Sequence, residues 1–222
     1  MKPLIVAFLL CLGLSQGQGL PKFMGREVTI TEPEIEDEFF PKGPASICVE
    51  GPPQRQCYIA PEDFGRYPSV TPVQIEKNMP ALLFSAASGG VSGYRIHFAL
   101  LRLGTGKDLD NLFLEVTVSN QSQTAFWTES TIADAPIFLT ADYSWGPDEA
   151  HYSEHRYVVS VYVRRPSSLL SDLDYFLEDR YMTVRKYYLD ANPDILTSEK
   201  QEILARLARI KAETERQKRK PR

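Results

Sequence analysis

The sequence has no long apolar run. Its most apolar stretch, "PLIVAFLLCLGL", follows Met1 and Lys2 and is shorter than the roughly 20 residues that a membrane-spanning helix needs. The small and polar residues of "SQGQG" come next. A basic residue, a short apolar core and small residues at the exit are typical of a secretory signal peptide. We therefore predict a signal peptide over residues 1–19 and an exported protein, secreted or periplasmic, without a transmembrane segment.

Cysteine is also scarce, with three residues in the chain and no C-x-x-C pair. A metal site of cysteines and histidines is therefore not expected. Cys11 lies in the predicted signal peptide, which leaves Cys48 and Cys57 in "CVEGPPQRQC". Two cysteines on either side of turn-forming residues in an exported chain predict one disulfide across a strand–turn–strand unit. Closing so short a loop stabilises the fold by about 2–3 kcal/mol in the chain-entropy model.

Basic residues are few outside the C-terminus. The chain has a net charge of −4, and removal of the predicted signal peptide with Lys2 changes it to −5. Residues 199–222 carry +5, so the preceding body is close to −10. Nucleic-acid binding needs a basic face on the fold itself. We therefore expect no nucleic-acid partner.

The body of the chain alternates between strand-like runs and turns. "NLFLEVTVSN" (111–120) and "RYVVSVYVRR" (156–165) show the period-two pattern of β-strands. In "RIHFAL" (95–100) the same alternation predicts a half-buried strand with His97 facing solvent or a cross-strand partner. The connections leave no room for helices. The sequence predicts an all-β fold, an antiparallel β-sandwich or barrel of about eight strands.

Both ends of the predicted β-domain, residues 46–190, differ from it. Residues 20–45 combine five acidic residues and three prolines within "TEPEIEDEFFPKGP", which predicts an extended N-terminal arm. Residues 191–222 change to helical spacing, with Thr197 and Ser198 as candidate N-caps. The sequence predicts a C-terminal α-helix, docked by one apolar stripe, and a basic tail without an assigned role.

The five residues "HYSEH" place His151, Glu154 and His155 in the H-x-x-E-H spacing of an inverted zinc-protease signature. Two histidines four apart face one metal only on a helix. The β-forming run from Tyr157 begins two residues later, so one helical turn at most fits. We interpret these as loop histidines, with a metal-dependent hydrolase as the alternative. The predicted mature chain has no G-x-S-x-G turn, and we expect no catalytic residues and no cofactor.

Aromatic side chains in predicted loops give the more credible site. "DYSWGPDEAHY" carries Tyr143, Trp145 and Tyr152 beside acidic residues, and "AFWTES" adds Trp127. Large aromatics bury much area at little entropic cost, which suits contact with a glycan or a protein. The alternative is that both tryptophans belong to the core.

We therefore predict an exported, non-enzymatic binding or structural module that contacts a protein, a glycan or the cell envelope. A third possibility is a carrier whose apolar cavity is lined by residues such as Phe98, Leu114 and Val161. Asn120 begins a glycosylation sequon, which matters only in a eukaryotic secretory pathway. The sequence indicates neither the ligand nor the oligomeric state.

Overall fold

The structure is a computed structural model that describes residues 22–34, 41–89, 95–114, 117–119, 123–129, 132–133, 135–150, 152–165, 174–188, 191 and 193–219. The predicted signal peptide, Asn120 and His151 lie outside these residues. The described part of the chain forms thirteen strands and two helices. All of its sheets are antiparallel. The predicted all-β sandwich with a C-terminal helix is confirmed, with more and shorter strands than the pattern indicated.

Three sheets follow one another along the chain. The first has the order β1-β2-β3, with bounds Val28–Thr31, Ser46–Val49 and Gln56–Ile59. The second has the order β4-β5-β6-β7, with β8 also pairing with β6; the bounds are Arg66–Glu76, Met79–Ser88, Arg95–Leu103, Leu109–Asn111 and Thr117–Ser119. The third has the order β12-β11-β10-β9, with β13 also pairing with β11; the bounds of β9 to β13 are Gln123–Trp127, Ile137–Ser144, Glu154–Arg165, Asp174–Met182 and Tyr187–Tyr188.

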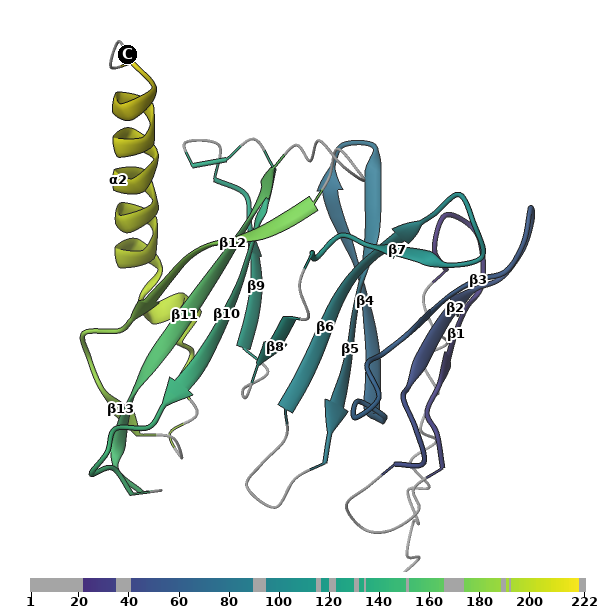
Figure 1. Cartoon of the computed structure of the whole chain (residues 1–222), viewed down its shortest axis with the longest axis horizontal. Coiled ribbons are helices and arrows are strands. Elements are labelled where there is room, and N and C mark those ends of the chain that lie inside the picture. The colour runs from purple at the N-terminus through teal and green to yellow at the C-terminus, as the bar shows by residue number, and fades with distance from the viewer. Residues whose placement is uncertain are drawn as a thin grey trace, which may run out of the picture.

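The sheets and the helices form successive layers (Figure 1). One apolar cluster lies between β1–β3 and the second sheet, and includes Ile47, Val49, Leu82 and Phe84. Another lies between the second and third sheets, and a third lies between the third sheet and the helices. Each of the two large sheets therefore has an apolar cluster on both faces, which explains why so many of their central residues are apolar.

The first sheet is stapled by the predicted disulfide. Cys48 and Cys57 are directly paired across β2 and β3, their Cα atoms are 4.1 Å apart, and their sulfurs are bonded. The buried side chain of Gln56 fastens this sheet to the β6–β7 turn. Its Nε2 donates to the carbonyls of Gly104 at 2.7 Å and Gly106 at 2.6 Å, and its Oε1 accepts from the Gly104 N–H at 3.1 Å.

The second sheet differs from expectation at His97. This residue lies in β6 and is fully buried, because the first sheet covers the face that the alternation left for solvent. Its Nε2 lies 2.8 Å from the hydroxyl of Tyr58 in the first sheet. Burial lowers the pKa of His97 to about 4, so its ring is neutral at physiological pH. Pro72 lies in β4, the outer strand of its sheet, where a residue without a backbone N–H is tolerated.

The predicted N-caps are wrong, because Thr197 and Ser198 lie inside the first of two C-terminal helices rather than before one. Helix α1, Ile195–Ser198, is capped by the Asp194 side chain, which accepts from the N–H of Thr197. Helix α2, Lys200–Lys218, follows at once, with Glu199 as its N-cap. Ile203 and Leu207 are buried against the third sheet, and the rest of α2 runs on beyond them (Figure 1). Neither of the described helices is apolar over the length that a bilayer requires.

Candidate functional site

The predicted aromatic residues are divided between two ends of strand β10. Tyr143 lies near the end of β10, where it pairs with Tyr157 of β11, and Trp145 directly follows the strand. Trp127 instead lies opposite Ile137, the first residue of β10. Tyr143 lies six positions further along β10 than Ile137, roughly 20 Å at 3.3 Å per residue. The structure therefore brings Tyr143 and Trp145 together and places Trp127 at the other end of the sheet.

The loop that joins β10 to β11 presents its aromatic side chains to solvent. Trp145 is 46% exposed and Tyr152 is 90% exposed. The Trp145 ring lies edge to face with the rings of Tyr143, at 5.5 Å, and His155, at 4.5 Å between centroids. The rings of Tyr143 and His155 thus cover part of the indole, and the rest of the indole is available for contact.

Glu149 braces this loop against the sheet. Its Oε2 accepts hydrogen bonds from the Gly146 N–H at 2.8 Å and from Nδ1 of His155 at 3.0 Å. Its Oε1 forms an ion pair with Nζ of Lys186 at 2.6 Å. Lys186 directly precedes β13, whose Tyr187 pairs with His155. One carboxylate therefore joins the loop, the first residues of β11 and the approach to β13.

The charges of this brace follow from its hydrogen bonds. The Lys186 ammonium, the Gly146 N–H and the His155 ring together lower the pKa of Glu149 to about 2. An ionised carboxylate can only accept, so Nδ1 of His155 donates the proton. The His155 side chain is 0% exposed, and its Nε2 has no hydrogen-bond partner in the part of the chain that the structure describes. His155 therefore supports Trp145 from within the fold.

Close packing at Gly146 fixes the start of the loop. A Cβ atom at this position would lie 2.9 Å from Cδ of Glu149, so a larger residue would displace the carboxylate. Two further hydrogen bonds close the second half of the loop, from the N–H of Ala150 to Oγ of Ser153 at 2.9 Å and from the N–H of Ser153 to the carbonyl of Ala150 at 2.9 Å. The loop is thus held by polar contacts rather than by an apolar core.

Two residues of the H-x-x-E-H spacing, Glu154 and His155, lie on a strand rather than on a helix. Glu154 and His155 are the first two residues of β11, and neighbouring strand residues point to opposite faces. Glu154 is exposed, whereas His155 is buried with Nδ1 bonded to Glu149. Among the described residues, no three histidine, cysteine or acidic side chains are grouped as a metal site would need.

The residues considered for an apolar cavity do not meet. Phe98 packs between the second and third sheets, Val161 packs between the third sheet and the helices, and Leu114 is exposed. These side chains occupy two different layers of packing and the surface.

Lys186 and Glu149 contribute to this candidate site, and the sequence did not indicate either of them. Lys186 lies 37 positions after Glu149, and only the pairing of β11 with β13 brings the two together. Glu149 stands out in the sequence only as one acidic residue of an acidic loop. Comparisons with protein-family models, with curated proteins and with solved structures found no match for this chain.

Proposed function

We propose that this protein is an exported, non-enzymatic binding module that contacts its ligand through the surface around Trp145, here called the Trp145 surface and formed by Tyr143, Trp145 and Tyr152. The observation that carries this proposal is a half-exposed indole on a loop that an ionised carboxylate ties to a sheet. A preformed aromatic contact surface loses little entropy on binding, which makes it an efficient anchor. The disulfide Cys48–Cys57 supports export, because such bonds persist in oxidising compartments.

A glycan suits this surface better than a large protein interface. The exposed indole offers a flat apolar contact, while Asp148 in the same loop and Lys186, which pairs with Glu149, add charged groups. A small ligand site combines aromatic contact with a few polar groups in this way. A stable protein interface buries about 800 Å² on each partner, which would have to extend well beyond this one loop.

The test is co-sedimentation of the protein with insoluble cell-wall glycan. Wild type, Trp145→Ala and Trp127→Phe are each incubated with purified peptidoglycan sacculi, and the bound fraction is measured against protein concentration. We expect the wild type and Trp127→Phe to bind alike, and Trp145→Ala to bind at least about tenfold more weakly, a loss of about 1.4 kcal/mol. Trp127→Phe is the matched control because it removes the other tryptophan.

Three results would contradict all or part of the proposal. Equal binding by Trp145→Ala and wild type would remove the Trp145 surface from the interaction. Absence of binding to sacculi by the wild type would rule out the cell-wall glycan as the ligand. Capture of an envelope protein by the Trp145 surface would show that the ligand is a protein and not a glycan.

A further inference from the structure

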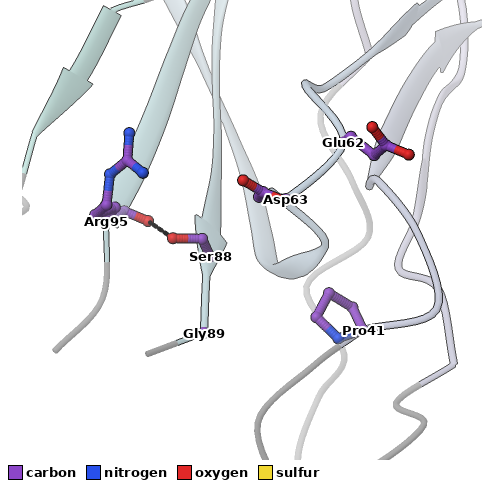
Figure 2. A pocket seen from close by; sticks show the side chains of 6 residues that line it. All are labelled: Pro41, Glu62, Asp63, Ser88, Gly89 and Arg95. Carbon is purple, nitrogen blue, oxygen red and sulfur yellow. Dashed lines mark hydrogen bonds between the residues drawn. The ribbon is translucent and has the colours of Figure 1, made fainter. Parts of the chain in front are cut away.

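A second candidate site lies away from the Trp145 surface, in a pocket of about 270 Å³ beside the second sheet. Its lining residues come from the turn after β3, the end of β5, the start of β6 and the segment before β2; they are Pro41, Glu62, Asp63, Ser88, Gly89 and Arg95 (Figure 2). Pockets for drug-sized ligands occupy about 300–1,000 Å³. This pocket therefore has room for a ligand of amino-acid or dipeptide size.

Charges of opposite sign line the two sides of the pocket. Arg95 and Ser88 stand on one side, Glu62 lies on the other, and the Asp63 carboxylate points across toward Ser88 (Figure 2). Neither Glu62 nor Asp63 forms an ion pair with another described residue. Asp63 and Arg95 thus line one pocket without neutralising each other, whereas the Glu62 carboxylate is turned away from Arg95 (Figure 2).

The basic side of the pocket is supported by the core. The Arg95 guanidinium lies over the ring of Phe64, 5.7 Å from its centroid. Phe64 is buried and packs at 5.4 Å against the ring of His97, which in turn bonds to Tyr58. An arginine placed on a buried aromatic ring loses less side-chain freedom when it binds a ligand.

The acidic side is supported by a tight turn. The N–H of Phe64 donates to the carbonyl of Pro61 at 2.9 Å and closes the turn that carries Glu62 and Asp63. Gly65 follows Phe64 and lies close to Pro41. A Cβ atom at Gly65 would be 2.6 Å from Cβ of Pro41. The backbone of the turn that carries Asp63 and the ring beneath Arg95 are therefore held in place, while the side chains of Glu62, Asp63 and Arg95 are exposed.

We infer that this pocket binds a small zwitterionic ligand, a free amino acid or a short peptide with both charged ends. Arg95 binds the ligand carboxylate, since its planar fork matches a carboxylate in a bidentate manner. Asp63 binds the ammonium group. A ligand of only one charge sign would meet a side of the pocket with like charge, which disfavours binding.

The experiment is a titration of the ¹⁵N-labelled protein, without the predicted signal peptide, with the dipeptide Ala-Ala. Binding is measured from the NMR chemical shifts of the backbone amides. N-acetyl-Ala-Ala, which lacks the ammonium, and Ala-Ala amide, which lacks the carboxylate, are the single-charge probes. The variants are Arg95→Gln and Asp63→Asn. Arg102→Gln is the matched control, because Arg102 lies on the same strand but pairs with Asp110 outside the pocket.

We expect saturable shifts at Ser88, Gly89 and Asp63 with Ala-Ala, and an affinity at least about tenfold weaker in Arg95→Gln and Asp63→Asn. Arg102→Gln should bind as the wild type does, and each single-charge probe should bind more weakly than Ala-Ala. No saturable shift at millimolar Ala-Ala would overturn the inference. Equal affinity in Arg95→Gln, or equal binding of the blocked probes, would overturn it as well.

Discussion

The two ends of strand β10 hold the two tryptophans of the chain, and they are built in different ways. At one end, Trp127 is half-buried among apolar residues beside the helices, and the Lys200 ammonium lies 5.1 Å from its ring centroid. At the other end, Trp145 rests on His155 and is held out by the Glu149 brace. Apolar packing hides the first indole, whereas a polar scaffold keeps the second in contact with solvent. Within one sheet, Trp127 therefore contributes to the stability of the fold, whereas Trp145 is available for binding.

Among the variants that test this comparison, we expect Trp127→Ala to have the largest effect on the free energy of unfolding. Removing the indole leaves a cavity beside the helices and should lower the free energy of unfolding by about 2–4 kcal/mol. Trp145→Ala should cost less, because half of its ring already faces water. Urea unfolding of both variants measures the difference, and an equal cost at the two positions would contradict this account.

A smaller effect should follow from Glu149→Gln, and it should depend on pH. The folded-state pKa of Glu149 is about 2, below its ordinary value of 4.5. Its ionised form therefore stabilises the fold fully above about pH 4.5, and this contribution is lost as the pH falls toward 2. The melting temperature of the wild type should exceed that of Glu149→Gln near pH 7, and the gap should close between pH 4.5 and 2.

The matched control is Glu154→Gln, which removes an exposed carboxylate from the same strand. Thermal melts of wild type and both variants, recorded at steps from pH 7 to pH 2, make the comparison. A gap for Glu149→Gln that stays constant down to pH 2 would show that the carboxylate does not act through its charge.

The smallest effect on stability should come from replacing the two lysines near the ends of β10, Lys186 and Lys200. Lys186 is 43% exposed in its pair with Glu149, and Lys200 is 40% exposed in its pair with Glu129. Exposed ion pairs stabilise by less than about 1 kcal/mol, and salt weakens them. Lys186→Met should change the emission of Trp145 alone, and Lys200→Met that of Trp127 alone. Single-tryptophan backgrounds carrying each lysine variant show which indole responds.

Local sequence patterns predicted single strands and one hairpin correctly. The alternation in 156–165 predicted that Tyr157, Val159 and Val161 share one face, and these residues pack together in the layer beside the helices. The position of Cys48 and Cys57 about a turn predicted their bond. In each instance the information lies within one strand or one hairpin, where the period of the backbone decides which side chains meet.

Contacts between layers could not be read in this way. The burial of His97 depends on the first sheet covering the second, and the brace at Glu149 depends on Lys186 arriving from 37 positions further along the chain. Neither leaves a local pattern. The separation of Trp127 from Trp145 likewise depends on the direction in which β9 pairs with β10.

Iodide quenching of tryptophan fluorescence tests the central claim most directly. The variant Trp127→Phe reports Trp145 alone, and Trp145→Phe reports Trp127 alone, since the chain has no other tryptophan. The account predicts a markedly larger quenching constant for Trp145 in the folded protein, and equal constants for the two variants after unfolding in urea. Protection of Trp145 equal to that of Trp127 in the folded state would contradict it and would remove the proposed binding surface.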